Sequence, residues 1–547
     1  MQLYFGVIRA TMGGMITART VQRTLTLAML SIAALMMPAA GLAQSAQPPV
    51  IEGDIAAMQH RMAAGTLTSE ALVRSYLERI AAIDDAGPVL NAVIATFPDA
   101  IEQARALDAE RAAGRVRGPL HGIPVLIKDN VEAAGPLPTT AGSLALADNV
   151  TGRDAPLVVR LRAAGAVILG KTNLSEWANI RSPESTSGWS AVGGLTRNPH
   201  DLSRSACGSS SGSGAAMAAG LAAATIGTET DGSIVCPSGS NGVVGFKPTV
   251  GLVSRTHIVP ISVSQDTAGP MVASVRDAAI MLDAMAGTDP ADPATREADA
   301  RRVPSYAATL SADGLRGLRI GVMRDRLGSR AEIRALFDAA LDVLRAQGAV
   351  IVDIAETRSG FERLGEIEGE ILFTELKAEM ARYLSGRPGD AGPQTLADLI
   401  AFNRATPSEM RWFGQELFEL AETKPADDDP EFIATRAAAR QLAGPDGIDR
   451  LRRDHGVDLL LGISNGPAWS IDLINGDNFA GPSASQLPAV AGYPHLTVPM
   501  GMVEGLPIGL SFIGTGWDDA RVLAAGHAYE AARGPFPRPA YRASVSP

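Results

Sequence analysis

Residues 205–220, SACGSSSGSGAAMAAG, place a glycine- and serine-rich tract directly before an alanine-rich apolar run. Such a tract can be a flexible linker, the turn that carries a nucleophilic serine, or a loop that cradles phosphate. This tract continues into an apolar helix without a change of composition, whereas a linker separates two independent segments. It also lacks the Gly-Lys-Ser/Thr ending of a phosphate-binding loop. Its role therefore depends on the residues around it.

The tract contains a literal G-x-S-x-G, with Ser210 as the central serine. That motif requires a preceding strand, which presents the serine on a sharp strand-to-helix turn. The preceding residues 196–207 are polar and rich in turn-forming side chains, so we predict no strand there. The four histidines that follow the tract have no shared sequence context from which to choose a catalytic partner. We therefore disfavour an esterase in which Ser210 is the essential serine.

Helical and apolar extended segments alternate along most of the chain. Helical periodicity predicts helices over 52–84, 99–114 and 330–347, and short apolar runs predict buried strands at 122–131, 166–173, 318–323 and 349–354. The alternation predicts an α/β fold with a covered sheet. Residues 355–450 are helical, charged and irregular, as an insertion or cap would be.

The first 43 residues differ from the rest. Arginines within residues 9–23 precede an uncharged apolar run, and the small residues Gly41 and Ala43 suit the positions before a cleavage site. This pattern predicts a signal peptide over residues 1–43 and a secreted or periplasmic protein without stable membrane association after cleavage. An uncleaved membrane anchor is the alternative, because the run is nearly long enough to span a bilayer.

Composition limits the partners. The formal net charge is −11 with no long basic run, which argues against a nucleic-acid partner. Cys207 and Cys236 are the only cysteines, so no zinc motif is present and no metal or cofactor is predicted. An oxidising compartment would permit a disulfide between them, but the sequence gives no distance and leaves the pairing open. The oligomeric state is not defined by the sequence.

Lysine is rare in this chain. Of 48 basic residues only five are lysine, and Lys128, Lys171 and Lys247 lie on either side of the tract. A buried lysine can lose its proton and act as a base, whereas arginine cannot. Lys128 ends the apolar strand predicted at 122–131, where burial would lower its pKa. The alternative is a structural lysine, paired with Asp129 for example.

A second candidate lies downstream, where Ser233 follows Asp231-Gly232 at a predicted turn. Backbone N–H groups in such a turn can converge on an oxyanion. A sequence of this kind is common in ordinary turns, so alone it carries little weight. Lys128, the tract and Ser233 together form an ordered set of base, relay and nucleophile.

These residues lie in segments that resemble the amidase signature family of serine hydrolases. The segments are GPLHGIPVLIKDN (118–130), LRAAGAVILGKTNLSEWA (161–178), CGSSSGSG (207–214), GTETDGS (227–233), SQDTAGPM (264–271) and GYPHLTVPMG (492–501). The resemblance extends over about residues 55–535. It implies one large domain over 50–540, in which a large mixed β-sheet is covered by helices on both faces and 355–450 is a variable helical insertion.

The resemblance also implies a Ser–cis-Ser–Lys triad. Lys128 matches the family's base, Ser209 the relaying serine that follows a cis peptide bond, and Ser233 the nucleophile. The backbone N–H groups around Ser233, including those of Thr230, Asp231 and Gly232, are expected to hold the oxyanion. This chemistry needs no metal or cofactor.

Within the family, the segments look most like those of peptide amidases, which remove the C-terminal amide of peptides. We therefore expect a small-molecule or peptide amide as substrate. An aryl acylamidase or another amide hydrolase of the family is an alternative, as is a catalytically silent binding subunit on the same fold. An exported acidic chain is a poor candidate for an enzyme component that acts on tRNA.

Overall fold

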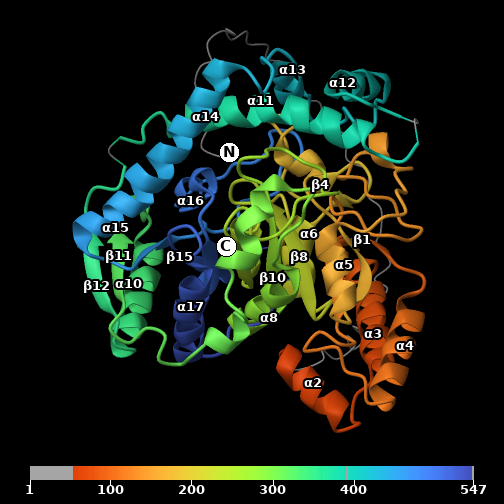
Figure 1. Ribbon diagram of the computed structural model, residues 1–547, viewed down its shortest axis with the longest axis horizontal. Coiled ribbons are helices and arrows are strands. Elements are labelled where there is room, and N and C mark those ends of the chain that lie inside the picture. The colour runs from red at the N-terminus through yellow and green to blue at the C-terminus, as the bar shows by residue number, and fades with distance from the viewer. Residues whose placement is uncertain (1–52, 359, 390–391, 545–547) are drawn as a thin grey trace, which may run out of the picture.

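The computed structural model describes residues 53–358, 360–389 and 392–544 (Figure 1). The predicted signal peptide, residues 1–43, lies outside the described residues. Across those described ranges, no helix is both long enough and apolar enough to cross a bilayer.

The centre of the molecule is a mixed sheet of eleven strands, which confirms the predicted fold class. In spatial order the strands are β1 (Val93–Thr96), β3 (Val167–Thr172), β2 (Pro124–Lys128), β8 (Ala224–Glu229), β10 (Thr267–Val272), β9 (Val244–Lys247), β14 (His495–Val503), β15 (Leu506–Ile513), β13 (Leu459–Ile463), β11 (Arg319–Met323) and β12 (Val350–Ile354). Two parallel groups, β3–β2–β8 and β13–β11–β12, flank a set of antiparallel strands. Strand β2 is buried along its whole length, which explains its unbroken apolar run.

Helices cover both faces of the sheet. One layer contains α6 (Ser211–Ala218) and α7 (Val235–Asn241), and the other contains α5 (Pro156–Ala163), α8 (Val275–Met285), α10 (Ala331–Ala346) and α17 (Asp519–Arg533). Successive side chains of β14 face opposite helical layers. Leu496 lies against Gly526 of α17. Its neighbour Thr497 pairs with Gly245, which lies against Ser238 of α7. A Cβ on Gly245 would come within 2.1 Å of the Ser238 hydroxyl oxygen, so this close approach requires glycine.

Three helices precede or follow the first strand near one edge of the sheet: α2 (Ile55–Ala63), α3 (Ser69–Arg79) and α4 (Ala100–Ala112). They correspond to the helices predicted over 52–84 and 99–114. The side chain of Thr68 accepts a hydrogen bond from the backbone N–H of Ala71 at 3.0 Å and so caps α3. Contacts of α3 with β2 and of α4 with β3 hold this group against the main sheet.

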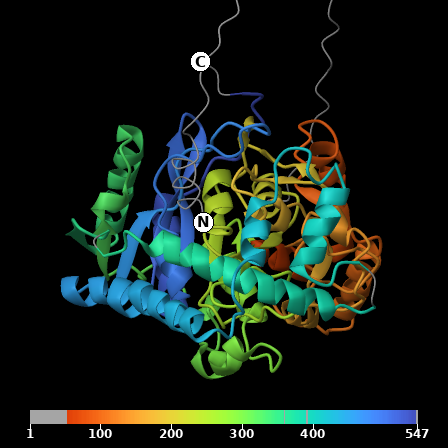
Figure 2. The ribbon, with the colours of Figure 1, turned by 90° about the horizontal axis from the view of Figure 1, so that it is seen from above.

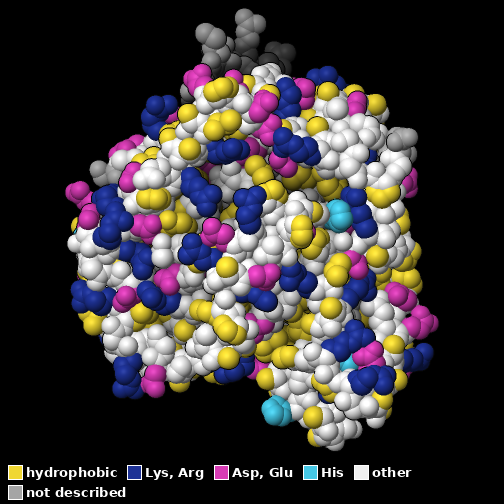
Figure 3. All heavy atoms as spheres, viewed as in Figure 1, with side chains coloured by type: hydrophobic (Ala, Val, Ile, Leu, Met, Phe, Trp, Pro, Cys, Tyr) yellow, Lys and Arg dark blue, Asp and Glu magenta, His cyan; other side chains and the backbone are white. Residues whose placement is uncertain are grey.

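The segment between β12 and β13 forms a helical layer across one end of the sheet, visible as an arch over the top of the molecule in Figure 1 and from above in Figure 2. Its helices are α11 (Leu364–Ser385), α12 (Leu396–Ala405), α13 (Glu416–Glu422), α14 (Pro430–Ala443) and α15 (Asp449–His455). Short helices α9 (Ala298–Arg301) and α16 (Gln486–Ala491) lie outside this layer in sequence. On the face shown in Figure 3, acidic and basic side chains are interspersed.

A buried charge cluster anchors the helical layer to the body. The guanidinium of Arg181, which is fully buried, lies 3.0 Å from Glu176 and 3.5 Å from Glu409 of the layer. The same guanidinium lies 4.3 Å from the centre of the Phe413 ring. Glu409 also accepts a hydrogen bond from the hydroxyl of Ser143. Because a buried charge needs a partner, these contacts fix where the layer sits.

One prediction about the segment before the tract was wrong. Residues 196–207 contain β6 (Arg197–Asn198) and β7 (Asp201–Ser205), which pair in a small sheet of their own. Polar composition conceals this hairpin because it lies outside the eleven-stranded sheet and does not alternate apolar and polar residues. A second small sheet pairs β4 (Trp189–Ser190) with β5 (Gly194–Leu195).

Candidate active site

Lys128 ends a central strand and lies entirely inside the protein. Strand β2 runs between β3 and β8, and its last side chain has no exposed surface. The Lys128 Nζ lies 2.8 Å from Ser209 Oγ, 2.9 Å from Thr228 Oγ1 and 3.3 Å from the Thr228 carbonyl oxygen. Among the described residues, no carboxylate lies within ion-pairing distance of it. The alternative of a structural pair with Asp129 therefore does not hold, since Asp129 pairs with Lys171 at 3.4 Å.

Burial lowers the pKa of Lys128 to about 7, although the negative charges of Asp266 and Glu229 act in the opposite direction. Much of the lysine is therefore neutral near pH 7. A neutral amine has two N–H donors, and both Thr228 oxygens can accept them. Its lone pair is then left for the hydroxyl of Ser209. This is the arrangement that a lysine base requires.

Ser209 lies in the loop between β7 and α6, and the peptide bond between Gly208 and Ser209 is cis. The residue is 1% exposed, and its carbonyl oxygen accepts a hydrogen bond from the backbone N–H of Ser175 at 3.0 Å. Gly208 passes so close to Ser175 that a Cβ would lie 2.2 Å from the Ser175 hydroxyl oxygen. The glycine of the tract is therefore needed for the close packing that carries the Ser209 hydroxyl to Lys128.

Ser233 lies on the turn between β8 and α7, beside the tract. Its carbonyl oxygen accepts a hydrogen bond from the backbone N–H of Ser210 at 3.2 Å, which brings the turn next to Ser209. Glu229 Oε2 accepts from the backbone N–H groups of Ile234 and Val235 at 2.7 and 2.9 Å and so fixes the turn from the other side. The hydroxyl of Ser233 forms no hydrogen bond with any described residue. Direct contact within the predicted triad is thus confined to Lys128 and Ser209.

The predicted oxyanion-binding residues lie on the same turn. Gly232 has a φ of +80°, a conformation that favours glycine. The backbone N–H groups of Gly232 and Ser233 donate to no acceptor within the part of the chain that the structure describes, so both can serve a ligand. Thr230 donates its hydroxyl to Asp266 at 2.6 Å, and its carbonyl oxygen accepts from Gln265 at 3.3 Å. Asp231 precedes Gly232 on this turn.

Ser210 occupies a structural position. Its hydroxyl donates to the carbonyl oxygen of Thr228 at 3.0 Å and accepts from the Thr228 N–H at 3.2 Å. It thereby ties the start of α6 to β8. A strand does precede the tract, but it belongs to the small β6–β7 sheet and not to the central one. The hydroxyl of Ser210 is occupied by backbone groups.

Sequence patterns do not reveal Thr228 or Asn130. Thr228 contacts Lys128 with both of its oxygens, and Asn130 donates its side-chain N–H to Thr228 Oγ1 at 2.9 Å. Threonine is common in strands, so its sequence context carries no sign of this role. Asn130 lies two residues after the lysine, and that proximity is the one available signal.

A cavity of about 500 Å³ opens beside these residues. Asn130, Thr228, Thr230 and Asp266 line it from the body of the protein, and Tyr383 lines it from α11. The helical layer between β12 and β13 therefore forms one wall of the cavity that Thr228 and Asn130 line from the body. Loops and insertions of this kind shape which ligands such a cavity accepts.

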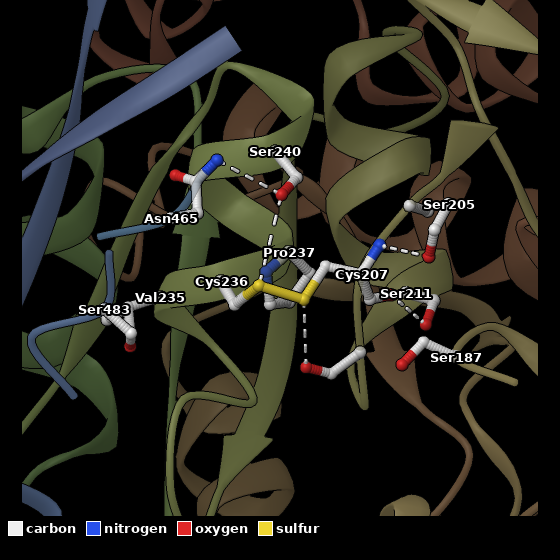
Figure 4. The surroundings of a disulfide bond; sticks show 12 residues. Ser187, Ser205, Cys207, Ser211, Val235, Cys236, Pro237, Ser240, Asn465 and Ser483 are labelled. Atoms are coloured by element: carbon white, nitrogen blue, oxygen red, sulfur yellow. Dashed lines mark hydrogen bonds between the residues drawn. A yellow bond between two sulfur atoms is a disulfide. The ribbon is translucent and has the colours of Figure 1, made fainter. Parts of the chain in front are cut away.

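The two cysteines form a disulfide, a question that the sequence leaves open (Figure 4). Cys207 precedes Ser209 by two residues, and Cys236 follows Ser233 by three, on the first turn of α7. The bond therefore links the loop that carries one candidate serine to the helix that follows the other.

Comparisons with known proteins identify the family of the chain. The model of the Amidase family matches residues 71–523. The structure superposes on a native peptide amidase from Stenotrophomonas maltophilia with a TM-score of 0.85 and 51% identity, covering 90% of this chain and 99% of that one. A protein of Arabidopsis thaliana named "Probable amidase" is 38% identical over 85% of this chain and 87% of its own. A glutamyl-tRNA(Gln) amidotransferase subunit of Chloroflexus aurantiacus is 36% identical over 87% of this chain and 96% of its own.

Proposed function

The chain belongs to the amidase signature family of hydrolases acting on amide C–N bonds, and from that premise we propose that it removes the C-terminal or primary amide of a peptide-like substrate through a Ser–cis-Ser–Lys triad. The contact that carries the proposal is the 2.8 Å separation of Lys128 Nζ from Ser209 Oγ. A fully buried lysine with a pKa of about 7 and no carboxylate partner among the described residues is suited to accept a proton.

The proposed reaction begins with a proton transfer along the triad. Neutral Lys128 takes the proton of Ser209, which takes that of Ser233 as the Ser233 oxygen attacks the amide carbonyl carbon. The negative oxygen that forms is held by backbone N–H groups of the turn, for which those of Gly232 and Ser233 are available. The resemblance assigns the same role to the N–H groups of Thr230 and Asp231, which precede them on that turn.

The second half of the reaction returns the proton. Ser209 passes a proton from Lys128 to the departing nitrogen, so that ammonia leaves and an ester to Ser233 remains. Water then attacks that ester with the same base assistance and releases the carboxylic acid. Every proton moved in this cycle starts and ends on a group of the site, the substrate or water.

Support for a peptide-like substrate comes from the Stenotrophomonas maltophilia peptide amidase, whose identity of 51% extends across nearly its full length. A role in tRNA amidotransfer has weaker support, because the identity of this acidic chain to the Chloroflexus aurantiacus protein is only 36%. A catalytically silent binding subunit is a poorer explanation, because all three predicted triad residues are present. An aryl acylamidase remains the alternative within the family.

Ammonia release from a matched panel tests the proposal. The panel contains amidated peptides, the same peptides with a free carboxylate, acyl-anilides and long-chain fatty amides, each assayed with wild type and with Ser233→Ala. We expect ammonia from the amidated peptides with wild type only. Hydrolysis of anilides without ammonia from any peptide amide would favour an aryl acylamidase, and no turnover of any substrate would favour a silent subunit.

We further propose that the chain is exported and that the mature protein begins near Gln44. The charged and then apolar order of residues 1–43 supports export, and the Cys207–Cys236 disulfide fits an oxidising compartment. The mass of the protein recovered from the periplasm or medium tests this. An intact N-terminus on membrane-bound protein would contradict it in favour of an anchor.

A further inference from the structure

We propose that the Cys207–Cys236 disulfide holds Ser209 and Ser233 in register, so that its reduction by a dithiol slows turnover while the fold persists. The inference rests on the proposed function, because it assigns the two serines to one reaction. It makes the cysteines positioning residues, since neither sulfur touches the reacting atoms.

The bond is the covalent link between the two serine-bearing segments. The tract and the Ser233 turn come from different parts of the chain, and the Cα atoms of Cys207 and Cys236 lie 6.1 Å apart. The backbone hydrogen bond from Ser210 to Ser233 is a noncovalent link close to the serines. The Asn241 side-chain N–H of α7 donates to the Ala206 carbonyl oxygen at 2.8 Å and is a second such link. Hydrogen bonds permit small shifts that a covalent bond does not.

The backbone at Cys207 points to the same role. Its φ of +56° lies in the left-handed region, which glycine adopts freely and other residues avoid. A cysteine at this position is costly unless its side chain makes a compensating interaction. Figure 4 shows that side chain directed across to Cys236, while the Cys207 carbonyl accepts from Ser211 and its N–H donates to Ser205.

Burial protects the Cys207–Cys236 disulfide from reductants in solution. Cys207 is fully buried and Cys236 is 5% exposed, and Trp469 packs against both. The Trp469 ring is itself held by a 2.9 Å hydrogen bond from its Nε1 to Asp477. Because no other cysteine exists in the chain, the bond cannot exchange within the molecule. A dithiol therefore needs local movement of the residues around the bond to reach it, which predicts slow reduction.

Reduction balances with a dithiol as the electron donor. The S–S bond breaks, each sulfur gains one electron and one proton, and the dithiol becomes a cyclic disulfide. The two thiols no longer fix the distance between the serine-bearing segments. Because a displacement of about 1 Å can cost about a hundredfold in rate, even a modest relaxation lowers turnover.

The test compares oxidised wild type, the same sample reduced with dithiothreitol, and the reduced sample after reoxidation. Reduction is verified by counting titratable thiols, and assays run below the melting transition of every form. We expect kcat to fall at least about tenfold on reduction with KM changed less than about twofold, and to recover on reoxidation. The double variant Cys207→Gly/Cys236→Ala places glycine, which adopts the left-handed backbone freely, at position 207. Its kcat should equal that of the reduced enzyme and should not change when dithiothreitol is added.

The rate at which a fluorophosphonate labels Ser233 is measured in parallel, because it reports positioning without requiring amide turnover. Labelling should slow together with kcat. Unchanged kcat and an unchanged labelling rate in fully reduced wild type would overturn the proposal. A reduced chain that is unfolded at every temperature would also overturn it, because the bond would then be only structural. If oxidised wild type hydrolyses no amide, the proposed function fails, and the labelling rate still decides the role of the disulfide.

Discussion

Lys128 Nζ lies 2.8 Å from Ser209 Oγ inside the protein, with both remaining polar contacts of the amine supplied by Thr228. This pairing distinguishes the lysine from Lys171, which faces the carboxylate of Asp129, so that its charge is compensated. A protonated amine surrounded by a hydroxyl and two neutral oxygens is stabilised less than one beside a carboxylate, so the neutral form of Lys128 is favoured. Lys128 is therefore the residue to test first.

Lys128→Arg should lower turnover at least about a hundredfold, because guanidinium stays protonated and cannot accept the Ser209 proton. The substitution keeps the positive charge and the donors, so a lysine with a purely structural role would tolerate it better. The measurement is kcat on the best amide of the substrate panel. Lys377→Arg, at a partly exposed lysine that donates to the Glu422 and Lys424 carbonyls, is the matched control. Retained activity in Lys128→Arg would show that Lys128 is not the base.

The pH dependence follows from the direction of the lysine shift. Burial lowers the pKa of Lys128 to about 7, and the reaction needs the neutral amine. Activity should therefore rise as pH increases through an apparent pKa of about 7 and level off above it. Initial rates over a pH series in which the protein stays folded measure this. A flat profile across neutral pH would contradict a lysine base with this pKa.

Ser233→Ala should abolish amide hydrolysis and labelling by a fluorophosphonate, without a change in melting temperature. The Ser233 hydroxyl makes no hydrogen bond with the described residues, so its removal costs little stability. Ser210→Ala is the informative comparison, because the Ser210 hydroxyl exchanges hydrogen bonds with Thr228 and should affect stability more than chemistry. A covalent adduct on Ser210 would instead identify an esterase-like nucleophile.

How much of the fold can be predicted varies with the element. Strand β2 is recognisable because parallel strands buried on both faces are unbroken apolar runs. Strand β10 is not, since Pro270 and Gly269 lie within it and proline normally argues against an inner strand. Strand order depends on contacts between distant segments, such as β9 with β14, that no local pattern encodes. The sheet is therefore predictable as a class but not in its topology.

For the site, local motifs identify the loops but not the contacts between them. Resemblance points to Lys128, Ser209 and Ser233, and the structure brings the first two into direct contact. Thr228 has no local signal because its role depends on facing the lysine from a neighbouring strand. The state of Cys207 likewise requires a distance that a sequence does not contain.

Thr228→Val should reduce kcat several-fold to tenfold, since valine keeps the shape but removes the hydroxyl that contacts both Lys128 and Asn130. A missing hydrogen bond to a buried amine costs about 1–3 kcal/mol. Loss of one acceptor disfavours the protonated amine further, so the apparent pKa of the activity profile should move down. Thr228→Ser retains the hydroxyl and should restore both values. An unchanged pH profile in Thr228→Val would exclude contact with the base.

Arg181→Leu should destabilise the protein by about 3–5 kcal/mol, because it leaves two buried carboxylates, Glu176 and Glu409, without their cation. Burial already raises the pKa of Glu176 well above its ordinary value even with Arg181 present. The loss of stability should be smaller at acidic pH, where Glu176 is protonated in both the folded and unfolded chains, and larger towards neutral pH.

The control for this change is Arg363→Leu, which removes an exposed ion pair with Glu366 whose side chains are 80% and 56% accessible. Solvent screens such a pair, so its loss should leave the unfolding transition nearly unchanged. Denaturant unfolding of both variants at two pH values measures the difference. Equal stability of the two variants would mean that the buried cluster does not anchor the helical layer. A large loss of stability confined to Arg181→Leu would show that charge, as well as apolar packing, holds this layer to the body.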